Sequence, residues 1–576
     1  MSVKARNTNQ KASPIWVALR RIGLTSLAVT VIGSQAQAQF TGNNQTNIIS
    51  GVTSNWTGDY YVGSNFVFDA LFIQNGGVLT NSGNGYIGQQ SGGKSNAVVV
   101  AGSGSAWKGG SSTELYVGNS DGKWSSLIIT NGGIVTCSLG FVGGAKNPGS
   151  SWSNVVVVTD PGSTWTCSTE LSVGDVGGSN TLIISDGGKV SSAAGYLGNR
   201  AFGGDNLVQV TGLGAVWSNS FFLFVGRDAG NNRLVISNGG NMIETGPGSI
   251  IGLNSSNNSV LVTGNGSIWN TYNELDVGES GSSNTLTISN GGSVFAISTY
   301  VGVSPGSVGN RIDVSDGGTL DAIMVLDVRG GTLSLSGGTV FTANLSLTNG
   351  SSSVIAFNRG TLDSEKTAVT NTQQFVVGDG VNVATFHVGN SPDPSSGIHS
   401  FANGLRVRAN SFLTGCGTIN GVVVVDAGGS VAANCGGALT FTSSVTNNGI
   451  MHAENGSVLE SYGPVVNNGL IDIMDGTTNF HSTFVNNGTI VGASYFRVVG
   501  LTKQGNDVKI AWTAVGGRRY VAQASMGDSN GGYTNNFTDL ILPFTVPGTS
   551  LSATNYLDVG GATNAPSRFY RVRLVP

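Results

Sequence analysis

The chain has 576 residues, of which 90 are glycine and only 10% are charged, and its formal net charge is −4. Lysine and arginine are scattered along the chain and form no basic stripe, so the composition argues against nucleic-acid binding. The 39% of hydrophobic residues can still build a large core if the chain is elongated, because the interior of a solenoid grows with its length.

Residues 1–38 have the pattern of a secretion signal. Basic residues between Lys4 and Arg21 precede a short apolar segment, Ile22 to Gly33, and Ala36-Gln37-Ala38 forms an A-x-A cleavage site. The mature chain is therefore predicted to begin at Gln39 and to be secreted or held at the cell surface, in a bacterial envelope or outside the cell. No later stretch is apolar enough to predict a membrane span.

A strict repeat dominates the chain after this segment. An asparagine recurs at a constant interval of ~26 residues, and a fixed period of this size is typical of a solenoid whose repeats stack on one another. Stacked amides can bond to each other along the axis, which predicts a structural ladder; the alternative is a binding ladder for a repetitive ligand such as a glycan. The ladder residues are Asn154, Asn180, Asn206, Asn232, Asn258, Asn284 and Asn310.

Each repeat contains three short strands rich in β-branched residues, separated by Gly- and Asn-rich turns. The third strand ends in a glycine, and tryptophan returns at one apolar position in every second repeat. The pattern predicts an all-β fold whose main part is a right-handed parallel β-helix with ~26-residue coils in ~52-residue double repeats. A β-propeller is the alternative, but the repeat divides into two similar halves, which propeller blades do not. The alternating residues are Trp107, Trp165, Trp217 and Trp269.

The pattern predicts three regions in the mature chain. The β-helix covers 39–496, with regular coils to about residue 330, an irregular segment at 363–410 that could be a looped-out insertion, and shorter coils over 411–496. From about residue 497 the strands alternate like those of an antiparallel sheet. Residues 497–576 are therefore predicted to form a small β-sandwich that resembles a fibronectin type III domain.

The four cysteines fit an oxidising compartment. Cys137 and Cys167 occupy the same slot in consecutive coils, and Cys416 and Cys435 are separated by about one coil in the region where the coils are shorter. Adjacent coils bring such residues close enough for a disulfide, so both pairs are predicted to be bonded; buried free thiols are the alternative. A metal site is not expected, because Cys-x-x-Cys is absent and no histidine stands nearby.

One segment carries a family resemblance. The run from Gly417 to Val431, Gly-Thr-Ile-Asn-Gly followed by a strand and a Gly-Gly turn, leads to Gly437-Ala-Leu-Thr-Phe441. It resembles autotransporter-associated β-strand repeats, although Asn434-Cys435-Gly436 replaces the usual Pro-Gly. The resemblance implies a secreted bacterial repeat protein and no particular reaction. An autotransporter would end in a translocator barrel, whereas this sequence ends in the predicted sandwich.

Two sets of polar residues are the candidates for catalysis. Glu114, Glu170 and Glu274 share one slot but lie two or four coils apart, which is roughly 10–20 Å and wide for a catalytic pair. In the irregular segment, the cluster of Asp379, His387, Asp393 and His399 matches no metal motif.

We therefore expect no catalytic residue, metal or cofactor. The sequence favours a structural or adhesive surface protein that presents a β-helix face to a matrix, a surface or a polysaccharide. A polysaccharide lyase or hydrolase of the β-helix class is the alternative.

Overall fold

The computed structural model describes residues 39–144, 151–389, 397–473, 475–492, 498–528, 530–547, 551–563 and 567–575. The predicted signal segment lies outside these residues. Two compact units divide the chain, Met1–Ala356 and Phe357–Pro576, and each is described by itself. Strands make up nearly all of the regular structure, and the described residues contain one 3-10 turn, Gly350–Ser352.

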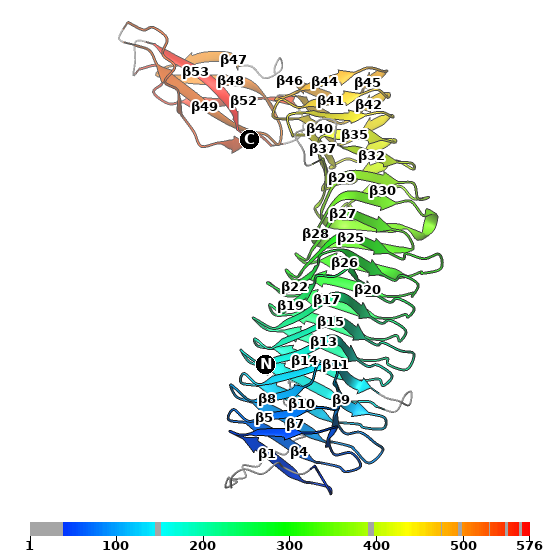
Figure 1. Ribbon diagram of the computed structural model, residues 1–576. Helices are drawn as coiled ribbons and strands as arrows, with labels where there is room; N and C mark the ends of the chain where they lie inside the picture. Colours follow the sequence, from blue (N-terminus) through cyan, green and yellow to red (C-terminus); the bar gives the residue numbers. More distant parts are fainter. Residues whose placement is uncertain are drawn as a thin grey trace, which may run out of the picture. The chain divides into compact units, whose positions relative to one another are not determined.

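The first unit is a parallel β-solenoid, as the repeat predicts (Figure 1). Each coil begins with a strand that pairs in parallel with its equivalent one coil later; for example, Thr181 pairs with Leu207 and Ser185 with Thr211. These first strands are β1 (Thr46–Ser50), β4 (Ala70–Gln74), β7 (Ala97–Ala101), β10 (Ser126–Thr130), β12 (Val155–Thr159), β14 (Thr181–Ser185), β16 (Leu207–Thr211), β18 (Arg233–Ser237), β21 (Ser259–Thr263), β24 (Thr285–Ser289) and β26 (Asn310–Ser315).

The second and third strands of a coil are separate in some coils and continuous in others. Where they are continuous, the register shifts at the bend, as between Ser192 and Ala194. These strands are β2 (Thr53–Trp56), β3 (Tyr60–Val62), β5 (Val78–Asn81), β6 (Gly85–Ile87), β8 (Ala106–Gly109), β9 (Glu114–Asn119), β11 (Ile134–Gly144), β13 (Thr164–Val173), β15 (Lys189–Leu197), β17 (Val216–Val225), β19 (Asn241–Glu244), β20 (Gly248–Ile251), β22 (Ile268–Thr271), β23 (Glu274–Val277), β25 (Ser293–Val301), β27 (Thr319–Val328) and β28 (Gly331–Leu347).

Large and small side chains alternate along the core. The tryptophans of every second coil are at most 2% exposed, and the strand register stacks Trp165 between Val135 and Val190. A smaller or unbranched residue above and below each indole fills the narrow interior without two tryptophans meeting. The predicted two-coil period therefore follows from core volume.

The glycine that ends each third strand is required by its neighbour. Gly198 has φ +78°, and a Cβ at this position would lie 2.1 Å from Nδ2 of Asn232 in the next coil. An L-residue would be strained by the positive φ and would also collide with the amide. Glycine and asparagine thus recur together, because the asparagine side chain occupies the space that a Cβ at the glycine position would need.

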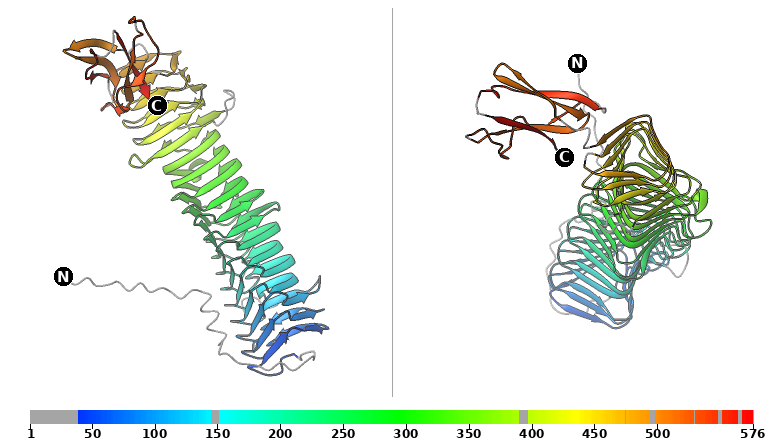
Figure 2. Two further views of the ribbon diagram at one scale, coloured as in Figure 1. Left: turned by 90° about the vertical axis from the view of Figure 1, so that its left-hand side faces the viewer. Right: turned by 90° about the horizontal axis from the view of Figure 1, so that it is seen from above.

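The second unit also contains parallel coils (Figure 2). Its repeats are shorter, since Val445 pairs with Val465, whereas Thr181 of the first unit pairs with Leu207. Its strands are β29 (Val354–Val369), β30 (Phe375–Val377), β31 (Ala384–Val388), β32 (Ile398–Phe401), β33 (Leu405–Val407), β34 (Ser411–Gly415), β35 (Gly417–Asn420), β36 (Val423–Val425), β37 (Ser430–Ala433), β38 (Ala438–Phe441), β39 (Val445–Asn447), β40 (Ile450–Ala453), β41 (Val458–Ser461), β42 (Val465–Asn467), β43 (Leu470–Ile473), β44 (Thr477–Phe480), β45 (Phe484–Asn486) and β46 (Thr489–Gly492). The idea of a looped-out insertion at 363–410 is wrong for the described part of that segment, because β29 pairs with β31 and β32, and β30 with β33.

Antiparallel sheets follow the last coil in the chain and form a small β-sandwich. One sheet contains β47 (Val498–Gln504), β48 (Asp507–Val515) and β52 (Leu551–Asp558); the other contains β49 (Arg519–Met526), β50 (Thr538–Asp539), β51 (Phe544–Thr545) and β53 (Arg568–Val575). Trp512 and Tyr520 are fully buried between the sheets, and Tyr570 and Val572 pack against them. Among the described residues, no helix is long and apolar enough to cross a membrane.

Candidate functional site

The asparagine column forms a continuous hydrogen-bonded ladder inside the solenoid. Oδ1 of Asn232 accepts two hydrogen bonds from Asn206, one from its backbone N–H at 3.1 Å and one from its side-chain Nδ2 at 2.9 Å. The backbone N–H and the Nδ2 of Asn232 in turn donate to Oδ1 of Asn258. The seven predicted members are at most 1% exposed. Their amides are occupied by one another and by turn carbonyls, so they are not placed to bind an external ligand. The ladder is structural.

The ladder position recurs in coils before the regular sequence period begins. Asp69, Asn96 and Ser125 occupy it in earlier coils; the N–H of Asp69 donates to Oδ1 of Asn96 at 2.9 Å, and the N–H of Ser125 to Oδ1 of Asn154 at 3.0 Å. Oγ of Ser125 has no hydrogen-bond partner among the described residues, so the row of bonds is interrupted there. The irregular spacing and the changed residue types hid these members.

Shorter ladders run through the second unit. Nδ2 of Asn447 donates to Oδ1 of Asn467 at 2.8 Å, and Nδ2 of Asn467 to Oδ1 of Asn486 at 2.7 Å. The neighbouring exposed asparagines form a parallel ladder in which Asn468 donates to Asn448 at 2.9 Å. The repeated Asn-Asn-Gly of the sequence therefore builds one buried and one exposed row of amides.

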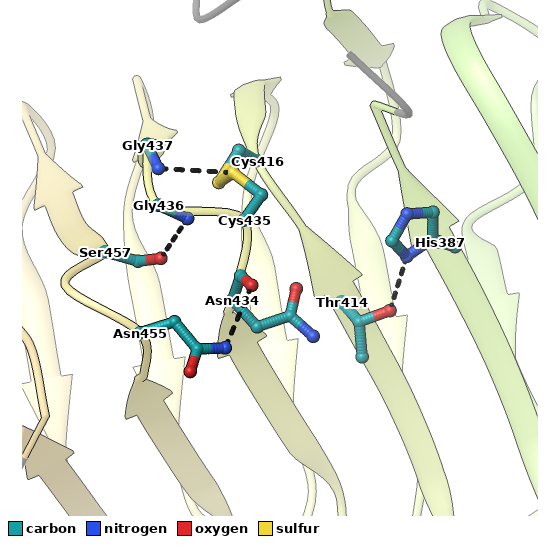
Figure 3. The surroundings of a disulfide bond; sticks show 9 residues. All are labelled: His387, Thr414, Cys416, Asn434, Cys435, Gly436, Gly437, Asn455 and Ser457. Atoms are coloured by element: carbon teal, nitrogen blue, oxygen red, sulfur yellow. Dashed lines mark hydrogen bonds between the residues drawn. A yellow bond between two sulfur atoms is a disulfide. The ribbon is translucent and has the colours of Figure 1, made fainter. Parts of the chain in front are cut away.

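The two cysteine pairs differ. Cys416 and Cys435 form a disulfide with a Cα–Cα distance of 5.9 Å, which confirms the prediction for this pair (Figure 3). Cys137 and Cys167 are paired in register, as predicted, but they are free thiols whose Sγ atoms lie 3.4 Å apart. The predicted second disulfide is therefore wrong. Both thiols are buried, and burial raises the pKa of the Cys167 thiol.

The three glutamates share one outward column, as predicted. Register places Leu139 between Glu114 and Glu170, and three coils lie between Glu170 and Glu274. They are therefore too far apart to act on one bond.

A tighter acidic group on β23 was missed by sequence reasoning. Burial, with a smaller contribution from the carboxylates of Glu274 and Glu279, raises the pKa of Asp276 to about 8. Glu274 lies two residues before Asp276 on the same strand, so neighbouring negative charge adds to the effect of burial.

An aromatic stack lies in the adjacent outward column. The rings of Tyr61, Tyr86, Tyr116 and Phe141 stack in succession with centroid distances of 4.9, 5.2 and 4.8 Å. The hydroxyl of Tyr116 donates to Glu114 at 2.6 Å. The sequence signal was an aromatic residue two positions before four closing glycines. Because each ring face is covered by the next ring, the stack stabilises the coils and leaves mainly ring edges and hydroxyls for contacts.

The polar residues of the 363–410 segment do not form one site. Asp379 closes a turn, and hydrogen bonds from Asn382 and Val381 lower its pKa to about 2. His399 is fully buried beside Thr367, and burial lowers its pKa to about 4. Asp393 lies outside the described residues.

His387 has different neighbours from those proposed from the sequence. It sits in register between Asp363 and Thr414, and its Nδ1 lies 2.9 Å from Oγ1 of Thr414 (Figure 3). An acid, a histidine and a hydroxyl in consecutive coils have the composition of a nucleophilic triad. A catalytic triad also needs a substrate cavity beside its nucleophile, and composition alone does not supply one.

The solenoid thus presents columns of repeated groups. No group of three or more metal-ligating side chains with the geometry of a metal site occurs among the described residues. No protein-family model matches the chain, and a search of curated proteins finds no significant match.

Proposed function

We propose that this protein is an exported structural or adhesive repeat protein that presents the lateral face of its β-helix to a matrix, a surface or a polysaccharide. A parallel β-solenoid is consistent with such a surface or structural role. Export is supported by the signal-like pattern of residues 1–38 and by the disulfide in the second unit, since disulfides persist in oxidising compartments. The resemblance of residues 417–441 to autotransporter-associated repeats points the same way.

The observation that carries this proposal is the repetition of polar groups along the solenoid. At the end of the first strand, every coil from β12 to β24 has a threonine or serine, and the hydroxyls bond in pairs at 2.9, 3.0 and 3.1 Å. The threonine of each pair is partly exposed. A rigid row of hydroxyls at a regular spacing suits a repetitive polymer better than a single small substrate. The pairs are Thr159 with Ser185, Thr211 with Ser237, and Thr263 with Ser289.

The alternative, a carbohydrate-active enzyme, is favoured by Asp276. A carboxyl group with a pKa of about 8 is protonated at neutral pH, as a general acid must be, and Glu274 and Glu279 lie beside it. This function ranks second because the solenoid mainly presents columns of repeated groups.

One experiment separates the two functions. Residues 39–576 are mixed with a panel of plant, algal and bacterial polysaccharides, and both retention on the polymer and new chain ends are measured. The proposal expects retention without new ends. New ends that disappear in an Asp276→Asn variant would establish the enzyme instead, whereas the absence of both retention and new ends would contradict polysaccharide binding.

Export has its own test. Residues 1–38 fused to a reporter are expected to direct it out of the bacterial cytoplasm, and replacement of Ala36 and Ala38 by bulky residues is expected to leave the signal uncleaved. A reporter that stays in the cytoplasm would contradict the proposed location.

A further inference from the structure

The turn before each asparagine of the ladder has one position with a left-handed backbone. Most coils fill it with serine, aspartate or asparagine, which tolerate this conformation well or form local hydrogen bonds there. Two coils instead hold Phe68 and Trp124, with φ of 59° and 58°. Bulky residues are rare at positive φ, and such strain is found most often at functional sites. The usual residues are represented by Ser95, Ser153, Ser179, Asp205, Asn231, Asn257 and Ser283.

Packing in the core does not explain why these two positions hold aromatic residues, because both side chains point away from the core into solvent. Phe68 is 60% exposed and Trp124 is 47% exposed. The coil between them has Ser95 at the same position, so three successive coils carry an aromatic, a small and an aromatic side chain. The exposed rings of Phe68 and Trp124 thus lie on equivalent turns two coils apart, with the small Ser95 between them.

A cavity of about 350 Å³ lies at this place. Its volume falls within the about 300–1,000 Å³ of typical small-ligand sites. The lining combines apolar surface with the hydroxyl-bearing residues Ser95 and Ser126 and the carboxyl-bearing Asp69. The residues that line it are Phe68, Asp69, Ala70, Ser95, Ala97, Trp124 and Ser126.

Asp69 also lines the cavity, and it belongs to the ladder inside the solenoid. It is 1% exposed, and its Oδ1 accepts the N–H of Gln45 at 2.8 Å, while its Oδ2 has no hydrogen-bond partner among the described residues. A buried polar atom of this kind is costly unless something completes its bonding.

We propose that the cavity between Phe68 and Trp124 binds one uncharged pyranose ring of a polysaccharide, with the ring held between the two aromatic side chains. Strand spacing puts the two turns roughly 9–10 Å apart, which accommodates one saturated ring with van der Waals contacts of about 3.5–4.0 Å on each side. The serine hydroxyls are suitable partners for sugar hydroxyls. Lys94 and Lys123 lie in the neighbouring column and do not line the cavity, which favours a neutral sugar.

This inference rests on the proposed polysaccharide binding and names its site. The test uses residues 39–576 and three variants: Phe68→Ser, Trp124→Ser, and Ser95→Phe, which fills the space between the rings while keeping both. Phe202→Ser is the matched control, because Phe202 is 63% exposed and does not line the cavity. The probes are cellohexaose, mannohexaose and laminarihexaose, with oligogalacturonate as the charged comparison, measured by calorimetry and by tryptophan fluorescence.

The wild-type chain is expected to bind at least one neutral hexasaccharide. All three cavity variants are expected to bind it at least about tenfold more weakly, because the two serine variants each remove an aromatic anchor and Ser95→Phe blocks the space between the rings. The control is expected to bind as the wild type does. The melting temperature of the two serine variants is expected to stay the same or to rise, because serine relieves the left-handed strain.

The outcomes separate the site from the function. Retention on a polymer that is unchanged in all three variants would overturn this site and leave the proposed function standing. Binding of oligogalacturonate alone would overturn the neutral-sugar assignment. A wild-type chain that binds neither polymers nor hexasaccharides would overturn both proposals.

Discussion

The asparagine ladder allows a quantitative prediction for Asn232→Ala. Asn232 is fully buried, and its side chain accepts two hydrogen bonds from Asn206 and donates to the carbonyl of Ala229 at 2.7 Å and to Oδ1 of Asn258 at 3.1 Å. Alanine would leave the backbone N–H of Asn206 buried without a partner. An orphaned buried donor costs about 1–3 kcal/mol, and each lost hydrogen bond about 1 kcal/mol. We expect the free energy of unfolding to fall by roughly 2–4 kcal/mol.

The measurement is urea unfolding of the two proteins, together with hydrogen exchange of peptides around residues 200–235. Asn254→Ala is the matched control, because Asn254 is exposed and its Nδ2 donates to Asp228 at 2.9 Å on the surface. The control is expected to change stability by less than about 0.5 kcal/mol. In a solenoid, stability is a sum of coil and interface terms, so exchange should rise first in the coils that contact Asn232. Equal effects of the two substitutions would refute the reasoning.

Three other perturbations have defined outcomes. Cys416→Ser removes the disulfide to Cys435 and is expected to lower the free energy of unfolding by about 3 kcal/mol, as measured by chemical denaturation without reductant. The pKa of Asp276 is raised from 3.8 to about 8 in the folded state, so the folded state binds this proton more tightly than the unfolded state does. The free energy of unfolding is therefore expected to fall as the pH rises from about 4 to about 8. The urea midpoint of Asp276→Asn should depend less on pH over this range. Arg518 bonds to Asp472 at 2.6 Å, where the carboxylate side chain is 1% exposed, so Arg518→Ala is expected to cost about 3 kcal/mol in denaturation followed by tryptophan fluorescence.

Each of these three predictions has a control or a result that would contradict it. Reductant should shift the wild-type midpoint to that of Cys416→Ser and leave the variant unchanged; a further shift in the variant would mean that Cys137 and Cys167 are bonded. A urea midpoint that rises between pH 5 and pH 8 only when Asp276 is present would reverse the assigned sign. Arg519 is exposed beside Arg518, and Arg519→Ala should have little effect; equal losses would show that the contact with Asp472 contributes nothing.

The sequence was sufficient for the architecture because a solenoid is built from local repetition. The ~26-residue period of asparagine and the alternation of tryptophan with smaller residues require every coil to repeat the same turn and the same inward positions, and stacking is the way to bury such a unit. The same logic placed Cys137 against Cys167 and Cys416 near Cys435. The alternating strands after residue 497 likewise predicted an antiparallel sandwich.

The candidate sites needed the tertiary structure, because they depend on which side chains meet across coils of unequal length. The interval from Phe68 to Ser95 differs from the interval from Ser95 to Trp124, so their common left-handed position is not visible as a period. Asp363 and His387 are neighbours only because β29 and β31 are paired.

Local pattern therefore determined the repeat, the strand order and the core of this protein, since these follow from side-chain size and turn preference at fixed intervals. Pattern also predicted that the two cysteine pairs would be close. Only the tertiary structure decided which pair is bonded, that burial raises the pKa of Asp276, and where two exposed aromatic rings line a cavity. These features depend on interatomic distances and burial, which vary from coil to coil even when the backbone repeats.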